Sequence, residues 1–223
     1  MRRFVWLVLA LLLTACATVP IPKTGPVTPC DPPCWNGITP GVTTLDEARG
    51  RLRQYLQPPD ALNEATFMDE SVELNWYAPN QGLNAVGASG GVVQLVSINL
   101  DGMTAADVLA QYGPPPAQLG LQRQGSERVL YAVTFLYPER GLSILLRTGR
   151  SSLLRPSPTR GFAVQPDTPV SAIRYLPPGP LEDFVARLPE VRRGQNAETA
   201  RARLRPWSGY GDESLTPLDI PAN

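Results

Sequence analysis

Two stretches of the sequence decide how it folds: ITPGVTTLDEA at residues 38–48 and INLDGMTAADV at residues 98–108. In both, an apolar residue, a turn glycine and a second apolar residue precede a threonine, and an acid follows that threonine three positions later. This spacing is that of a capping box, in which each side chain accepts a hydrogen bond from the other residue's backbone amide. Each stretch therefore predicts the start of a helix, capped by Thr44 or Thr104.

The two predicted helices are short and amphipathic. The first ends before Pro58 and Pro59, and the second stops at Gly113, ahead of three prolines. The first helix has a single apolar face made by Leu45, Ala48, Leu52 and Leu56. Two helices of this size cannot form a core alone, so each must pack on strands.

Alternation of apolar and polar residues predicts those strands. It appears in residues 72–77 and 92–100, and further strands are predicted at 118–123, 129–137, 142–147 and near 170–175. Residues 78–91 are rich in Gly and Asn and predict a long loop. A helix followed by antiparallel strands, twice over, predicts an α+β fold of two tandem two-layer units, each a helix or short helix pair on an antiparallel sheet.

The second stretch also resembles a known family. Gly102-Met103-Thr104, Asp107-Val108, Tyr112-Gly113 and Pro115 resemble the Gly-Met-Thr/Ser, acid-Val, Leu-Gly-x-Pro signature of the SmpA/OmlA (BamE-like) lipoproteins. The tandem arrangement is similar to that of β-lactamase inhibitory protein. The first copy departs from the signature, with Gln57-Pro58-Pro59 where Gly-x-Pro is expected. The resemblance implies a non-enzymatic protein-binding or assembly role at the cell envelope.

The N-terminus predicts export and lipidation. A basic start, Met1-Arg2-Arg3, precedes the apolar run 4–13, which is shorter than the roughly 20 residues of a membrane-spanning helix. Leu13-Thr14-Ala15-Cys16 resembles the bacterial lipobox, which implies lipid attachment at Cys16, cleavage before it and acylation of the new N-terminus. Residues 1–15 are therefore predicted to be a signal peptide. Several acyl chains would anchor the mature protein at the extracytoplasmic face of a bacterial membrane without spanning it.

The other two cysteines, Cys30 and Cys34, predict a disulfide, because an even remainder of cysteines in an exported chain is typical of one. A metal site or a redox pair is the alternative for these two residues. A zinc shell would lack further ligands, however, and redox pairs usually have two intervening residues.

Composition divides the chain and excludes several functions. We expect a lipidated, proline-rich tether at 16–35, a first α+β repeat at 36–100, a second at 101–180, and a C-terminal helix with a charged tail at 181–223. The 223 residues include no His and one Lys, and 20 basic residues balance 20 acidic ones. The balance argues against nucleic-acid binding, and the missing side chains exclude His-based catalysis and His-ligated metals. We expect no cofactor, metal or catalytic residue.

Three groups of side chains remain as candidates. Asp69, Glu70 and Glu73 are the tightest acidic group; they would have to serve any carboxylate-dependent hydrolase, and we expect them to be a solvated face. Trp207 and Tyr210 are expected to pack on the sheet, with a binding tip as the alternative. An arginine-rich stretch is either a solvated loop or a contact for lipid headgroups or an acidic partner. It contains Arg147, Arg150, Arg155 and Arg160.

The predicted function is that of a membrane-anchored lipoprotein that binds another envelope protein. The alternative is a module that binds cell-wall glycan or a small ligand. An aromatic groove around Trp76 or Trp207 would favour glycan, and a flat apolar patch would favour a protein partner.

Overall fold

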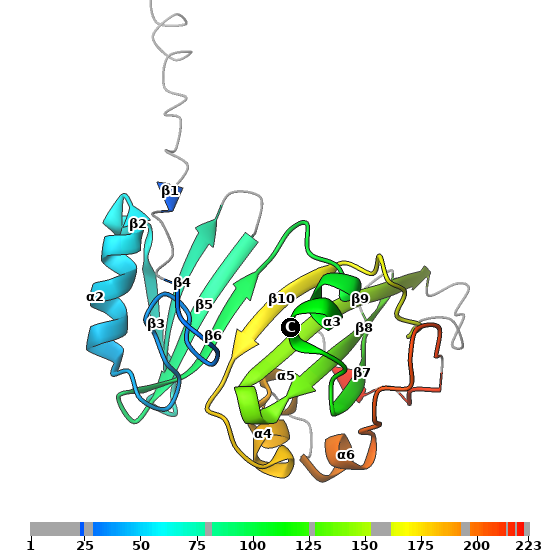
Figure 1. The fold of residues 1–223 in the computed structure, drawn as a ribbon. Coiled ribbons are helices and arrows are strands. Elements are labelled where there is room, and N and C mark those ends of the chain that lie inside the picture. Colours follow the sequence, from blue (N-terminus) through cyan, green and yellow to red (C-terminus); the bar gives the residue numbers. More distant parts are fainter. Residues whose placement is uncertain are drawn as a thin grey trace, which may run out of the picture.

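The chain folds around one large, twisted sheet (Figure 1). The computed structural model describes residues 23–24, 29–78, 82–124, 128–152, 162–192, 197–212, 214–216 and 218–220. Within them the elements are β1 (Lys23–Thr24), α2 (Leu45–Tyr55), β2 (Leu56–Gln57), η1 (Pro59–Ala61), β3 (Asn63–Thr66), β4 (Val72–Ala78), β5 (Gly82–Ser89), β6 (Val92–Asn99), α3 (Ala105–Tyr112), β7 (Ala117–Gln124), β8 (Arg128–Tyr137), η2 (Pro138–Arg140), β9 (Leu142–Ser152), β10 (Val170–Tyr175), α4 (Leu181–Arg187), α5 (Pro189–Arg192), α6 (Ala197–Ala202) and β11 (Leu218–Ile220).

Nine of these strands form the sheet, in the order β11-β7-β8-β9-β10-β6-β5-β4-β3. Eight of them pair in antiparallel fashion, and only β11 lies parallel to its neighbour, β7. The two short strands β1 and β2 pair separately, through Lys23 with Gln57 and Thr24 with Leu56.

The predicted fold of two tandem helix-and-sheet units is wrong. Strand β10 lies between β9 and β6, where Ile173 is opposite Ile144 on one side and Ile98 on the other. The sheet therefore passes without a break across the expected boundary at residue 100. An unpaired β6 edge would leave backbone amides and carbonyls without partners, and pairing with β10 satisfies them.

The helices cover both faces of the sheet. α2 and α3 lie on one face, where Ala48 and Leu52 of α2 and Val108 of α3 have no exposed surface. α4, α5 and α6 lie on the opposite face, over β7 to β9, with Phe184 and Val185 buried against Leu119. Because side chains alternate along a strand, the central strands bury residues on both sides. The sequence predicted a helix at the start of residues 181–223, where α4 lies, but not a helical layer on this second face.

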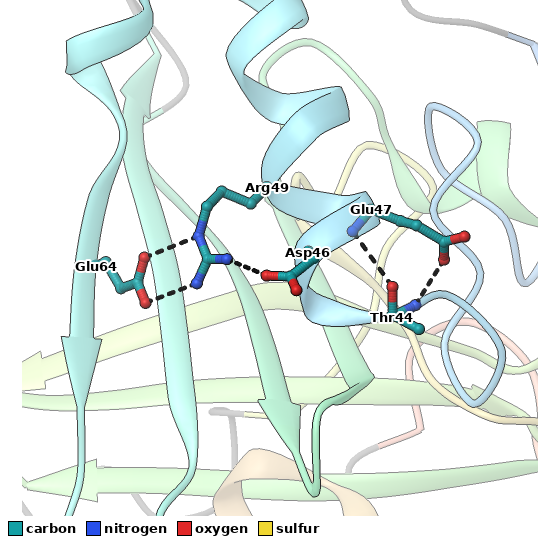
Figure 2. Close-up of polar contacts among 5 residues, drawn as sticks. All are labelled: Thr44, Asp46, Glu47, Arg49 and Glu64. Carbon is teal, nitrogen blue, oxygen red and sulfur yellow. Dashed lines mark hydrogen bonds and ion pairs between the residues drawn. The ribbon is translucent and has the colours of Figure 1, made fainter.

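The predicted capping boxes are both present. Thr44 Oγ1 accepts a hydrogen bond from the Glu47 amide at 3.3 Å, and the Thr44 amide donates to Glu47 Oε2 at 2.9 Å (Figure 2). Thr104 and Asp107 make the same reciprocal bonds at the start of α3. These hydrogen bonds favour the charged carboxylates and so lower the pKa of Glu47 and of Asp107.

An ion pair ties α2 to the edge of the sheet. Arg49 Nε and Nη2 donate to the two carboxylate oxygens of Glu64 on β3, at 3.1 and 2.9 Å, and Arg49 also contacts Asp46 (Figure 2). The hydrogen bonds that Arg49 donates to Glu64 raise the pKa of Arg49. α2 is thus held against β3 by a bidentate contact, the stronger geometry for arginine and carboxylate.

Two local predictions were also wrong. Residues 82–89, within the predicted loop 78–91, form strand β5, in which the buried Asn84, Val86 and Ala88 alternate with more exposed residues. The charged tail predicted after the C-terminal helix contains two further helices, α5 and α6. Glu190 of α5 is buried and pairs with Arg174 of β10.

Candidate interaction surfaces

One half of the sheet has a face on which none of the described helices packs. In β4, Leu74 and Trp76 point towards α2, so the alternate residues Glu73, Asn75 and Tyr77 point to the opposite side. On that side the α4–α6 cluster packs over β7 to β9 and reaches Leu95 of β6, and no described helix packs on β4 or β5. We call this surface the open face. Two hollows lie along it, one at each end of β5.

The first hollow lies between the β3–β4 turn and the α4–α5 junction, and we call it the turn hollow. Its volume is about 340 Å³. Phe67, Val72 and Leu95 supply apolar wall, and Asp69, Glu73 and Arg187 supply charge. A hollow lined by both apolar and charged side chains suits the side chains of another protein.

The turn at this hollow holds two large apolar side chains in solvent. Phe67 is 51% exposed and Met68 is fully exposed. The Phe67 amide donates to the Ser71 carbonyl at 2.9 Å, the Glu70 amide donates to the Phe67 carbonyl at 3.0 Å, and Ser71 Oγ donates to Asp69 at 2.6 Å. Glu70 adopts a φ of 60°, a left-handed conformation that is costly for a residue other than glycine. The turn therefore presents Phe67 and Met68 in a fixed geometry.

The second hollow lies where β5, β6, β9 and β10 meet, and we call it the seam hollow. Its volume is about 540 Å³, and Gly82, Asn99, Asp101, Arg147 and Ser171 contribute to its lining. Asn99 is held there by its amide, which donates to Asn84 Oδ1 at 2.8 Å, and by its side chain, which donates to the Leu83 carbonyl. Ser171 Oγ donates to the Leu145 carbonyl at 3.1 Å. Arg147 is exposed and makes no ion pair with the described residues.

The predicted arginine group is only partly described. Arg147 and Arg150 both lie on β9, so this part of the stretch is a strand and not a loop. The side chain of Arg150 lies outside the described residues, as do Arg155 and Arg160 entirely. Of the four, Arg147 alone can be placed at a surface, and it lines the seam hollow.

The acidic group is spread over the turn. Asp69 accepts hydrogen bonds from Ser71, Glu70 occupies the left-handed position, and Glu73 is on the open face. Within the described residues no group of three or more His, Cys, Asp or Glu is placed to hold a metal ion. Asp69 therefore helps to shape the β3–β4 turn, and Asp69 and Glu73 place negative charge at the turn hollow.

The two candidate tryptophans are engaged in packing. Trp76 has no exposed surface and lies against Trp35 and Tyr55, with ring centroids at 5.6 and 6.5 Å. Trp207 packs edge-to-face on Phe135 at 4.9 Å, and Tyr210 packs on Trp207 at 5.6 Å. The predicted packing of the C-terminal aromatic residues is thus observed.

The N-terminal predictions fall mostly outside the described residues. Residues 1–15, with the predicted signal peptide, and Cys16 are not described. Cys30 and Cys34 form the predicted disulfide, with their Cα atoms 5.6 Å apart. Among the described residues, no helix is both long and apolar enough to cross a bilayer.

Sequence reasoning missed the exposed apolar residues Phe67, Met68 and Leu83. Met68 and the acids beside it are a weak signal for an exposed turn, and Leu83 lay in a predicted loop.

No protein-family model matches the chain, and neither the curated proteins nor the solved structures include a significant match. The resemblance to the SmpA/OmlA lipoproteins, read from residues 102–115, therefore stays a prediction.

Proposed function

We propose that this chain is a lipoprotein, anchored through Cys16 at the extracytoplasmic face of a bacterial membrane, whose folded part binds another protein of the cell envelope. The anchor is supported by the basic start, the short apolar run and the lipobox-like Leu13-Thr14-Ala15-Cys16. The disulfide between Cys30 and Cys34 agrees with an oxidising compartment outside the cytoplasm.

Binding of a protein partner is supported above all by the β3–β4 turn. Phe67 and Met68 stand in solvent beside the turn hollow, and hydrogen bonds within the turn hold them there. Exposed aromatic and methionine side chains over a partly apolar recess are typical of the anchors of protein interfaces. A preorganised turn also loses little conformational entropy on binding.

The glycan-binding alternative relied on an aromatic groove at Trp76 or Trp207. Trp76 is buried in the core, and Trp207 is packed between Phe135 and Tyr210. A sugar ring would need an exposed aromatic face, which Trp76 does not offer. No observation on the described residues favours the alternative.

The test is co-purification of the full-length chain from cross-linked, detergent-solubilised membranes. We expect a stoichiometric protein partner with the wild type, and at least a tenfold loss of recovery with the double variant Phe67→Ser, Met68→Ser, because central apolar anchors carry about 2 kcal/mol or more each. Leu130→Ala is the matched control, since Leu130 is 40% exposed on β8, away from the turn.

Each part of the proposal has its own contrary result. Equal recovery of the partner with the double variant would exclude the turn as the binding site. Absence of any partner would count against protein binding. Membrane retention of a cleaved Cys16→Ala chain would contradict lipid anchoring, which is assayed in the same fractions.

A further inference from the structure

The pairing of β1 shortens the tether between the lipid and the folded part. Residues 17–33 form a proline-rich stretch that could extend on the order of 50 Å. However, Lys23 and Thr24 already pair with Gln57 and Leu56 at the end of α2. Seven Cα steps then separate Cys16 from Lys23, and a fully extended chain spans at most about 25 Å over that length.

A tether of this length restricts which end of the protein meets the bilayer. A compact chain of this size is about 40 Å across. The end that carries β1 and β2 therefore lies nearest to the lipid anchored at Cys16, and the opposite end points away. This step rests on the proposed lipid anchor.

The end next to β1 is the one where β4 ends and β5 begins. β3 starts at Asn63, opposite Asn75, which brings residues 57–62 beside the last residues of β4. In Figure 1, β1 and β2 lie at this end, and the start of α2 lies at the other. Thr44, at that start, bridges to Val92 at the beginning of β6. The β3–β4 turn also lies at the far end, since Val72 pairs with Ala88.

The near end carries an apolar pair and an arginine on the open face. Tyr77 and Leu83 are directly opposite one another on β4 and β5 and are 59% and 56% exposed. Leu83 adjoins the seam hollow through Asn99, which donates to its carbonyl, and Arg147 lines that hollow. We call Tyr77, Leu83 and Arg147 the proximal patch.

The far end carries more exposed acidic side chains than the near end, although Arg187 also lines the turn hollow there. The far end exposes Asp46 and Glu47 at the start of α2, and Asp69 and Glu70 in the turn. The near end has Arg53, in the last turn of α2, and Arg147 as bases, with Asp60 of η1 and Asp101 of the seam hollow as acids. An anionic bilayer attracts basic side chains and repels acidic ones over about a Debye length.

We infer that the proximal patch rests on an anionic phospholipid surface, with Tyr77 and Leu83 at the headgroup level and Arg147 facing lipid phosphate. Tyrosine and leucine suit this boundary because each offers apolar surface, and tyrosine adds a hydroxyl that stays hydrated. The lipid at Cys16 holds the patch close, so even weak contacts are populated. The turn with Phe67 and Met68 then points away from the membrane, towards a partner.

The test reconstitutes the full-length, lipidated chain into vesicles of phosphatidylethanolamine with and without phosphatidylglycerol. A fluorophore is attached to a single free thiol, either Leu83→Cys in the patch or Met68→Cys at the far end, because Cys16 carries lipid and Cys30 and Cys34 are bonded. Headgroup-labelled quencher lipid reports contact. We expect quenching at position 83 with phosphatidylglycerol, weakening in high salt, and little quenching at position 68.

Two charge variants on the Leu83→Cys background sharpen the test. Arg147→Gln should lower the contact equilibrium about fivefold, and Asp101→Asn should raise it by a similar factor, since each charge near an anionic surface has an effect of this order. Arg147 and Asp101 line the same hollow. A merely structural disturbance would therefore not shift the contact equilibrium in opposite directions in the two variants.

The outcomes separate this inference from the proposed function. Failure of the chain to float with vesicles would remove the lipid anchor and with it the orientation. Flotation with equal quenching at both positions, or quenching that ignores phosphatidylglycerol and Arg147, would overturn the orientation alone. If position 83 is shielded from solvent in native membranes but not in lipid vesicles, a protein covers the patch. That result also overturns the lipid assignment.

Discussion

Trp76 packs against two aromatic residues and stabilises the packing of α2 on the sheet. It has no exposed surface, stacks on Trp35 and meets Tyr55 edge-on. Trp76→Ala should lower the free energy of unfolding by about 3–5 kcal/mol, measured by urea denaturation, because it leaves a large cavity. The adjacent Tyr77 lies on the opposite face and is exposed, so Tyr77→Ala should change stability far less. Similar losses in the two variants would argue against this placement of the core.

Tyrosines packed against the core make the fold sensitive to alkali. Burial raises the pKa of Tyr175 to about 12, and it raises the pKa of Tyr137, whose hydroxyl donates to the Gly113 carbonyl at 2.7 Å. Because the folded state favours the neutral phenol, this stability is fully present below the ordinary pKa of 10 and is lost as the pH rises from 10 towards 12. Each such group contributes a slope of about 1.4 kcal/mol per pH unit in that window.

Tyr175→Phe provides the measurement for this pH dependence. It keeps the ring and removes the titrating hydroxyl, so the free energy of unfolding should fall less steeply between pH 10 and 12 than in the wild type. Urea titrations at several pH values would determine the slope. An unchanged slope would mean that Tyr175 ionises as readily in the folded state as in the unfolded chain.

At the scale of elements, α5 is attached to the sheet through a buried ion pair. The side chains of Arg174 on β10 and Glu190 on α5 are 11% and 8% exposed. Removing one partner leaves the other charge buried and uncompensated. Glu190→Ala should therefore lower the free energy of unfolding, measured by urea denaturation, by about 3–5 kcal/mol. Replacing both, as Arg174→Met with Glu190→Leu, should cost much less. Equal losses of unfolding free energy in the single and double variants would show that the shape of the side chains, and not their charge, determines the stability.

The sequence identified the elements whose signals are local. Both helix starts follow from a threonine and an acid three residues apart, and β4 and β6 follow from alternation. Strand β5 was missed because its Gly and Ala residues resemble a loop when read alone. The turn hollow and the burial of Glu190 depend on distant segments, α4, α5 and β10, which a local pattern cannot report. The candidate surfaces therefore required the structure.

At the scale of the whole molecule, the central question is whether the two halves of the sheet unfold together. β6 and β10 are joined by backbone hydrogen bonds, and Leu100 and Tyr175 pack against both the α2 core and the α3 core. Contacts that two regions share make their unfolding cooperative. We therefore predict one unfolding transition for the whole sheet, in contrast to the two units suggested by the repeated helix starts.

Phe135→Ala tests that cooperation across the sheet. Phe135 is fully buried under α3 on β8, far in the strand order from β5. Phe135→Ala should lower the free energy of unfolding by about 3–5 kcal/mol. If the sheet unfolds as one, the slowest amides of β5 should lose the same free energy of opening as those of β8 in native-state hydrogen exchange. If β5 kept its protection while β8 opened, the halves would be independent, and the β6–β10 pairing would join two units that each fold alone.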